Sequence, residues 1–273
     1  MSTTRLVVIG DIHAGVNRSS LPGSSVYHIL SEWVSFINQV IKPDVIIDLG
    51  DRLNPVDGNS DSEVLREIGN ILGNADCPVY FILGNHDLDN LSQREHEEAI
   101  GYNLGNRSVQ VKDFRLLLVN AQDPVVQGIG GSVSEKTLDW IRNELRNESR
   151  RAVLFTHQAT NEEKLERNLH FRGIEEFAYV SNRKELLDIC EESGDVVAAI
   201  NGHVHWPSIF VEESILHVSV PSFTDTWNEL PNVPGSFTVI DLCEDEISVE
   251  NYMFKPSILM GRFTICSKRR GKK

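Results

Sequence analysis

Nine short apolar runs divide this chain, and each of them stops at a turn or a polar residue. Most have the length and the Val, Ile and Leu content of buried strands; they are Leu6–Ile9, Val45–Leu49, Val79–Leu83, Leu116–Val119, Val153–Phe155, Val196–Ile200, Ile215–Val220, Phe237–Leu242 and Ile247–Tyr252. Segments of helical period lie between several of these runs, at Val26–Val40, Leu138–Leu145 and Arg183–Cys190. Strands that alternate with helices predict an α/β domain.

The 273 residues suffice for one large domain or two small ones. No repeat, low-complexity tract or Pro/Gly linker divides them, so we expect a single domain over 1–266 and a basic, disordered tail over 267–273. From about Ile209 the pattern is one of strands with little helix, which predicts an antiparallel or mixed portion. Leu53–Ser62 and Gln158–Asn182 lack clear periodicity, and we expect them to be long loops.

The composition is that of an ordinary globular protein, with 40% hydrophobic and 24% charged residues. No apolar stretch approaches the roughly 20 residues of a membrane helix, and the first residues lack the apolar core of a signal peptide. The four cysteines show no CxxC spacing, which disfavours both a disulfide framework and a thiolate zinc site. We therefore expect no membrane span and a reducing, cytoplasmic location.

The charge balance disfavours a nucleic-acid partner. Acidic residues outnumber basic ones by 40 to 26, which gives a net charge of −14, and five of the basic residues lie in the tail 267–273. So acidic a body repels a phosphate backbone unless a local patch or a bound cation reverses the field. The tail is the one feature that favours such a partner.

Polar residues that can bind a metal follow five of the apolar runs, at the strand ends where α/β sheets place ligand sites. They are Asp11 and His13, then Asp51, then Asn85, His86 and Asp87, then His157, and finally His203 and His205. A lone Asp-x-His or Gly-Asp is more often a turn or a surface group. The Gly-His-Val-His run is stronger, because alternate residues of an extended segment point to the same side. The five together predict a metal site.

The types of these side chains narrow the choice of metal. Imidazole, carboxylate and amide donors suit Mn²⁺, Fe, Zn²⁺, Co²⁺ or Ni²⁺, and the lack of thiolates argues against a closed structural zinc site.

The order Asp-x-His, Gly-Asp, Gly-Asn-His-Asp, His and Gly-His-x-His, from Asp11 to His205, resembles the calcineurin-like metallophosphoesterase superfamily. The Gly-Asn-His-Asp form and the length are most similar to its class III cyclic-nucleotide phosphodiesterase group. The resemblance implies a four-layer α-β-β-α sandwich with two mixed sheets. It also implies two metal ions, whose bridging hydroxide attacks phosphorus.

The resemblance also implies a role for each motif residue. Seven would be metal ligands, with a first metal on Asp11, His13 and His205, a second on Asn85, His157 and His203, and Asp51 bridging the two. The catalytic residue would be His86, as proton donor to the leaving oxygen or as a stabiliser of its charge.

Three further residues each have two possible roles. Arg52, where many relatives have small or apolar residues, could contact the substrate phosphate or pair with an acid. Asp87 could orient His86 or cap a helix. Arg172, with Phe171 and Tyr179, could cap the metals, or its loop could pack on its own domain. The remaining histidines are expected to be ordinary structural or surface groups: His28, His96, His170 and His217.

The function predicted from these patterns is a metal-dependent phosphoesterase that prefers a diester, with a cyclic nucleotide as the leading substrate. Phosphomonoesterase and nucleotide pyrophosphatase activity on small metabolites stay open, and a nuclease is disfavoured by the acidic body. A non-catalytic scaffold on this fold is the rival from another class, although it would lack the ligands that this chain keeps. The expected partner is a small-molecule phosphate ester, and the oligomeric state is left open.

Overall fold

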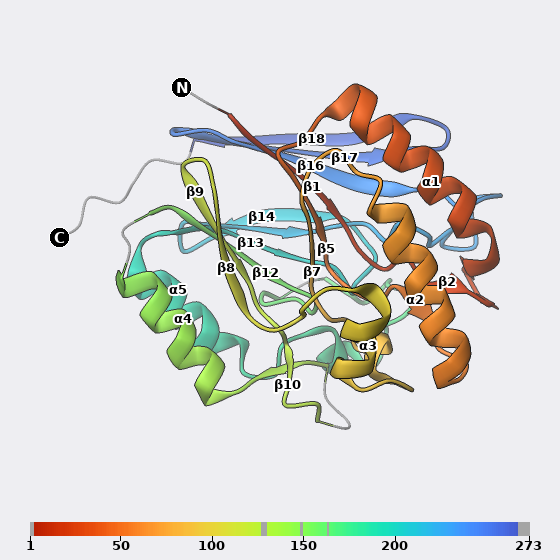
Figure 1. The fold of residues 1–273 in the computed structure, drawn as a ribbon. Helices are drawn as coiled ribbons and strands as arrows, with labels where there is room; N and C mark the ends of the chain where they lie inside the picture. The colour runs from red at the N-terminus through yellow and green to blue at the C-terminus, as the bar shows by residue number, and fades with distance from the viewer. Residues whose placement is uncertain (1–2, 127–129, 148–149, 163, 267–273) are drawn as a thin grey trace.

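Two six-stranded sheets form the centre of the molecule (Figure 1). The structure is a computed structural model that describes residues 3–126, 130–147, 150–162 and 164–266. The first sheet has the order β18 (Ile258–Cys266), β17 (Glu246–Met253), β16 (Ser236–Leu242), β1 (Thr4–Ile9), β5 (Val45–Asp48) and β7 (Val79–Phe81). The second has the order β14 (Ser208–Glu212), β15 (Ile215–Ser219), β13 (Val196–Asn201), β12 (Ala152–Thr156), β9 (Phe114–Leu118) and β8 (Arg107–Val111).

The two sheets pack face to face through a fully apolar core, to which both contribute alternate side chains. Helices α1 (Val26–Phe36) and α2 (Gly58–Leu72) cover the outer face of the first sheet, and α3 (Gln93–Ile100) packs on α2. Helices α4 (Glu135–Asn147) and α5 (Arg183–Ser193) cover the outer face of the second sheet. The layers therefore run α-β-β-α, which confirms the fold class expected from the sequence (Figure 1).

Strand direction decides where the site lies. Strands β1, β5 and β7 run parallel to one another, as do β9, β12, β13 and β15. Their carboxyl ends therefore meet at one edge of each sheet, and the loops that leave them lie side by side. All nine predicted strands are present, and the final part of the chain is antiparallel as expected, with β16, β17 and β18 in sequence.

Short elements complete the chain. Two-residue strands pair in three ribbons, which are β2 (Ala14–Gly15) with β6 (Leu53–Asn54), β3 (Asn17–Arg18) with β4 (Leu21–Pro22), and β10 (Gln122–Asp123) with β11 (Ser132–Val133). The short helical turns are η1 (Gly23–Ser25), η2 (Ile37–Ile41), η3 (His86–Leu88) and η4 (Glu175–Ala178).

One of the two long loops predicted from the sequence is not a loop in the structure, so this prediction is wrong. The segment Leu53–Ser62 contains strand β6 and the first turns of α2, which begins at Gly58. The Asp57 side chain accepts hydrogen bonds from the backbone N–H groups of Asn59 and Ser60, so its polar run is a helix cap rather than a loop. The other segment, Gln158–Asn182, is largely irregular over its described residues, and the predicted tail lies outside them.

Among the described residues, no helix combines the length and the apolar character needed to cross a bilayer.

His217 provides a test of the sheet packing that is independent of the site. It is buried in β15 and stacks on Phe210, with ring centroids 5.2 Å apart, and burial lowers its pKa to about 4. The unfolded chain, with a histidine pKa near 6.5, therefore binds a proton that the folded chain excludes, so stability falls as the pH drops from about 6.5 towards 4. Between pH 7.5 and pH 5, the unfolding free energy measured in urea should fall by about 1–2 kcal/mol less in the His217→Gln variant than in the wild type. The matched control is His28→Gln, on an exposed face of α1, and equal pH dependence in all three proteins would contradict the assignment.

Candidate metal centre

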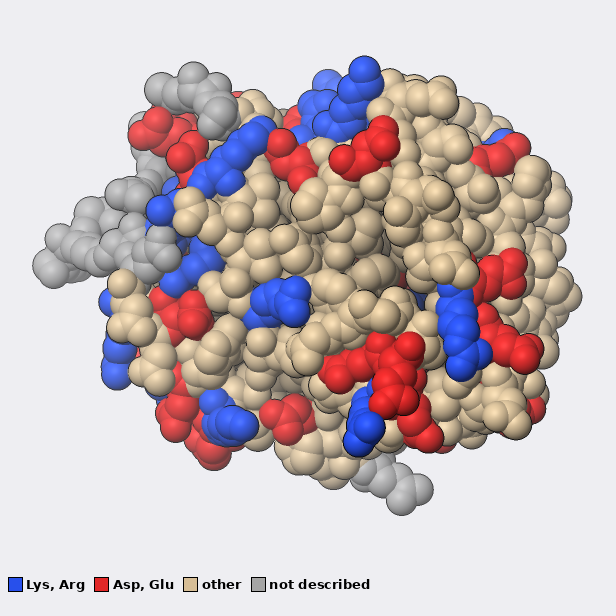
Figure 2. Space-filling model, in the orientation of Figure 1, with Lys and Arg blue, Asp and Glu red and all other residues tan. Residues whose placement is uncertain are grey.

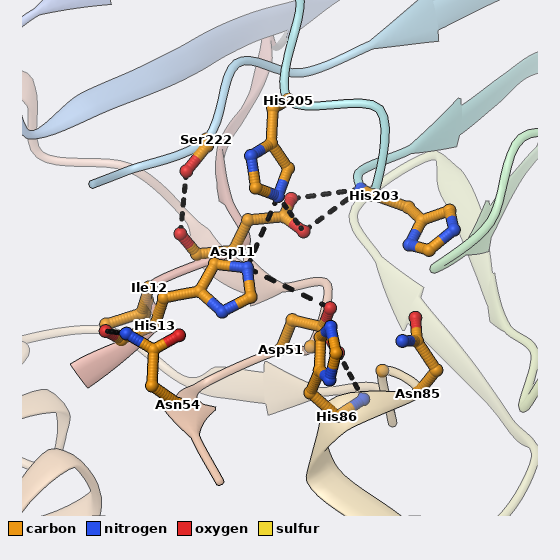
Figure 3. A network of polar contacts seen from close by, with 12 residues as sticks. Asp11, Ile12, His13, Asp51, Asn54, Asn85, His86, His203, His205 and Ser222 are labelled. Carbon is orange, nitrogen blue, oxygen red and sulfur yellow. Dashed lines mark hydrogen bonds and ion pairs between the residues drawn. The ribbon is translucent and has the colours of Figure 1, made fainter. Parts of the chain in front are cut away.

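The loops that follow β1, β5, β7, β12 and β13 bring all seven predicted ligands together, and Figure 3 labels each of them except His157. In the part of the chain that the structure describes, three groups of three have donor atoms that lie within 4.8 Å of one another. Two of these groups consist of predicted ligands and are buried: Asp11, His13 and His205 form the first, and Asp51, His157 and His203 form the second. The third, His170, His205 and Asp225, shares His205 with the first group.

In the first group two imidazole nitrogens face one another beside a carboxylate. His13 Nε2 lies 3.3 Å from His205 Nε2, and His205 Nε2 lies 3.4 Å from Asp11 Oδ1. In the second group His157 Nε2 lies 3.1 Å from His203 Nδ1 and 3.2 Å from the Asn85 side-chain oxygen. Converging nitrogen and oxygen donors of this kind fit divalent metal ions.

Asp51 joins the two groups. Its Oδ2 lies 4.0 Å from His13 Nε2 and 3.3 Å from His157 Nε2, so one carboxylate faces both sets of donors. Its other oxygen accepts a 2.9 Å hydrogen bond from the backbone N–H of His86 (Figure 3). This is the position that a bridging ligand needs, and the donors therefore fit two ions.

The ligand backbones are strained. Five of the seven predicted ligands have a positive φ, namely Asp11 (54°), His13 (45°), Asp51 (53°), His203 (66°) and His205 (62°). This conformation costs a non-glycine residue about 1–2 kcal/mol. It corrects the reasoning about Gly-His-Val-His, because both imidazoles face the centre from a tight turn rather than from an extended segment.

Glycines let two of the ligand loops approach each other. A Cβ at Gly84 would lie 2.1 Å from Asp51 Oδ1, and a Cβ at Gly50, where φ is 102°, would lie 2.3 Å from the Gly84 nitrogen. Any side chain at either position would push apart the loops that present Asp51 and Asn85.

The four histidines among the predicted ligands differ in the direction in which their pKa is shifted. Burial lowers the pKa of His13 to about 4 and, together with nearby His157, that of His203 to about 3. Burial also disfavours the charged forms of His157 and His205, but Asp51 and Asp11 outweigh it and raise their pKa values to about 9 and 10. Burial raises the pKa of Asp51, yet the surrounding histidines hold it well below its ordinary value.

The phosphate contact expected of Arg52 is wrong. Its side chain is completely buried, with Nε 3.0 Å from Asp48 Oδ2 and Nη1 2.9 Å from Asp87 Oδ2. Nη2 donates to the carbonyl oxygen of Ile82, and Nη1 lies 3.3 Å from His96 Nε2. The guanidinium therefore faces the interior behind the ligand loops, and its acidic partners are buried carboxylates rather than surface ones.

Asp87 takes neither of the two roles left open for it, because it does not contact the His86 ring and does not cap a helix. Its carboxylate accepts hydrogen bonds from the backbone N–H groups of Asp51, Arg52 and Gly84, so it ties together the loops after β5 and β7. The partner of His86 is Asp89, whose Oδ2 lies 2.9 Å from His86 Nδ1. Residues His86–Leu88 form η3, and Asp89 caps it. In this 3₁₀ turn the residue at position i+3, Asp89, lies beside the His86 imidazole, and the residue at position i+1, Asp87, does not.

His86 lies at the rim of the centre, with a side chain 41% exposed. Its ring meets that of His13 edge-on, with centroids 5.7 Å apart. Burial of part of the ring lowers its pKa, but Asp51 and Asp89 outweigh this and raise it. Since Asp89 engages Nδ1, Nε2 is left to donate a proton.

Sequence reasoning missed two residues of the centre. Asp225 is fully buried and accepts a 2.8 Å hydrogen bond from His205 Nδ1, and its other partner is His170. Neither follows a predicted strand with a motif, so no local signal marked them.

Arg172 is exposed and directly follows Phe171, whose ring packs on His203. The contact of Arg172 with substrate stays a prediction.

Comparisons with known proteins agree with this geometry. The sequence profile described as calcineurin-like phosphoesterase matches residues 4–207. A protein of Arcobacter nitrofigilis, named probable glycerophosphodiester phosphodiesterase GpdQ, is 25% identical over 225 residues, or 82% of this chain and 74% of that protein.

Solved structures share the fold. A dimetal phosphatase from Danio rerio has a TM-score of 0.75 at 15% identity, covering 97% of this chain and 99% of that one. GAP50, described as the anchor in the inner membrane complex of Plasmodium, has a TM-score of 0.64 at 12% identity, covering 99% and 90%.

Metal content tests the two groups separately. The metal-depleted chain should take up two Mn²⁺ ions, and at 100 times its Kd each ion should stabilise the fold by about 2.7 kcal/mol. Asn85→Ala should remove one ion, whereas Asp51→Ala, which breaks the bridge, should weaken both. Calorimetry and elemental analysis measure this. A wild-type chain that takes up no divalent ion would instead favour the non-catalytic scaffold.

Arg52 should matter for stability rather than for substrate binding. Arg52→Met leaves Asp48 and Asp87 buried without their cation, which should cost about 3–5 kcal/mol in urea unfolding. Arg94→Met, at a side chain 86% exposed on α3, is the matched control and should cost under about 0.5 kcal/mol. A raised KM in Arg52→Met with an unchanged unfolding free energy would instead support a contact between Arg52 and the substrate phosphate.

Proposed function

Since this chain belongs to the calcineurin-like phosphoesterase family, we propose that it is a dinuclear-metal phosphodiesterase in which His86 protonates the leaving alkoxide. The observation that carries the proposal is the placing of His86. Its ring lies beside the ligand His13, its backbone N–H donates to the bridging ligand Asp51, and Asp89 engages Nδ1. One nitrogen is thus held while the other is available at the rim of the centre.

The chemistry divides between the ions and the chain. Two divalent ions would supply Lewis-acid stabilisation of phosphate charge and an acidified water. We propose Mn²⁺, Fe, Zn²⁺, Co²⁺ or Ni²⁺, because the donors are imidazoles, carboxylates and an amide. The chain holds these donors in fixed directions through the strained loops. Breaking the phosphorus–oxygen bond of an alkyl ester leaves an alkoxide, and the raised pKa of His86 favours the protonated imidazole that neutralises it.

Charge favours a diester over a monoester. Arg52, the cation nearest to the motif residues in sequence, is buried behind the loops, and the groups that face one another in the centre are histidines, an amide and two carboxylates. A diester carries one negative charge and a monoester up to two, and Arg52, buried behind the loops, offers no partner to the second charge of a monoester. The name of the Arcobacter nitrofigilis relative supports the same class. We propose a small-alcohol diester, of which a cyclic nucleotide is one form.

Surface charge gives no support to a nuclease. Figure 2 shows one face of the molecule, on which basic and acidic side chains are interspersed rather than gathered in a basic stripe. The whole chain carries a net charge of −14, which disfavours binding to a polyanionic backbone.

Leaving-group dependence tests the role of His86. Bis-p-nitrophenyl phosphate releases a stable phenolate, whereas glycerophosphoethanolamine releases an alkoxide that needs a proton. With the Mn²⁺-loaded chain, His86→Ala should lower kcat for the alkyl diester by about 10²–10⁴-fold and should affect the aryl diester much less.

The control for this test is His28→Ala, which should match the wild type on both esters. Equal losses on the two diesters would rule out proton donation by His86. A wild-type preference for p-nitrophenyl phosphate over the aryl diester would overturn the phosphodiesterase and favour a phosphomonoesterase on the same centre.

A further inference from the structure

Asp225 lies at the crossing of several hydrogen bonds beside the first group of ligands. Its Oδ2 lies 2.8 Å from His205 Nδ1 and 2.6 Å from His170 Nε2, and its Oδ1 accepts the backbone N–H of Trp227 at 2.8 Å. The carboxylate is fully buried, so these contacts replace its lost hydration. Both oxygens are thus committed, and one of them is shared by two imidazoles.

The segment Asn168–Phe171 is fastened to the same ligand turn. The Asn168 side chain, 1% exposed, donates a 2.7 Å hydrogen bond to the carbonyl oxygen of Val204, which lies between the ligands His203 and His205. Its amide oxygen accepts the backbone N–H groups of His170 and Phe171 at 2.9 and 3.2 Å. A buried asparagine with three such bonds fixes the segment on the turn.

Two consecutive rings of this segment cover the two ligand histidines. The His170 ring lies 4.4 Å from that of His205, and the Phe171 ring lies 4.8 Å from that of His203, measured between centroids. Phe171 is buried, whereas the His170 side chain is 26% exposed. His170 is therefore the partly solvent-accessible member of the pair, next to the first metal group.

We propose that Asp225 positions His205 for the first metal and, through the same oxygen, fixes His170 as a binding residue for a hydroxyl on the alcohol part of the substrate. The substrate half of this inference rests on the proposed function, whereas the metal half does not.

The metal half follows from the tautomer. As an ionised carboxylate only accepts, His205 must carry its proton on Nδ1 to satisfy Asp225. Nε2 then presents its lone pair towards His13 and Asp11, where the first ion would bind. Partners of this kind orient a ligand imidazole, and their loss typically lowers metal affinity 10- to 100-fold.

The substrate half follows from the remaining nitrogen of His170. Its Nε2 is engaged by Asp225, which leaves Nδ1 as the other hydrogen-bonding atom of a ring that is one imidazole away from the first metal group. A ring held in this way has one hydrogen-bonding atom left, which suits a single hydroxyl. The substrate class is therefore a diester of a hydroxylated alcohol.

The first experiment measures metal affinity on the full, metal-depleted chain. In Asp225→Asn the amide can donate to His205 Nδ1, which forces the proton onto Nε2 and blocks the lone pair. We expect the Kd of the first Mn²⁺ to rise 10- to 100-fold in calorimetry, and no change from His28→Phe. A Kd within twofold of the wild type overturns the positioning role.

A second measurement needs no variant. In the Zn²⁺-loaded wild-type chain, ¹H–¹⁵N NMR of the histidine rings should show the His205 proton on Nδ1. A proton on Nε2 overturns the proposal even where Asp225→Asn does not fold.

The third experiment tests His170 through a matched pair of substrates. His170→Phe keeps a ring against His205 but cannot hydrogen-bond. KM for glycerophosphoethanolamine, which carries glycerol hydroxyls, should rise about 3- to 10-fold, whereas KM for bis-p-nitrophenyl phosphate, which has none, should stay within twofold. The Mn²⁺ affinity should also stay within twofold. Equal changes for both esters, or none, overturn the hydroxyl contact.

Failure of this proposal is distinct from failure of the proposed function. If the wild type hydrolyses only monoesters, the proposed phosphodiesterase activity is wrong. The hydroxyl contact of His170 can then be tested by comparing the effect of His170→Phe on KM for glycerol phosphate, which carries hydroxyls, with its effect on KM for p-nitrophenyl phosphate, which has none. The calorimetry and the NMR measurement depend on neither substrate.

Discussion

Left-handed backbone at five metal-ligand positions is the constraint on which the rest of this structure depends. At about 1–2 kcal/mol each, the five residues together store an amount comparable to the net stability of a typical domain. Such strain persists only where the surroundings over-determine the conformation. Here the loops are tied to one another, because the Asp11 N–H donates to the carbonyl oxygen of Gly50 and the His203 N–H donates to the Asp11 carboxylate. Each ligand loop is thus held by another ligand loop, and behind them lies the apolar core between the two sheets.

The buried charges behind the centre serve the same constraint. Arg52 lies between Asp48 and Asp87, and Asp87 in turn accepts the N–H groups that start the Asp51 loop. Burial raises the pKa of Asp48 to about 6, and Arg52 opposes that rise. A buried pair of this kind adds little net stability compared with apolar residues of the same volume, but removing one partner is costly because it leaves a buried charge unpaired. The ligand loops therefore depend on all three charged groups being present together.

Local pattern predicted the strands and the polar residues at their ends, whereas the layers and the roles of the seven predicted ligands came from the resemblance to a family. A strand is visible as an apolar run, and a ligand as the polar residue at its end. The partners of Arg52 and His205 could not be found this way, since Asp87 and Asp225 are 35 and 20 residues distant and carry no signal of their own. His170 looked ordinary because its loop has no period. Helix α2 was missed at its start, where a capping aspartate, glycine and asparagine read as a turn.

Contacts within the chain hold the predicted donors in their directions. The Asp11 and Asp51 carboxylates accept the backbone N–H groups of His203 and His86, so each carboxylate is fixed by a loop that follows another strand. Asp225 and the carbonyl oxygen of Leu49 engage the Nδ1 atoms of His205 and His157, so the Nε2 atom of each ring faces the other donors. The left-handed turns, and the buried charges that hold them, therefore fix the direction of these donors.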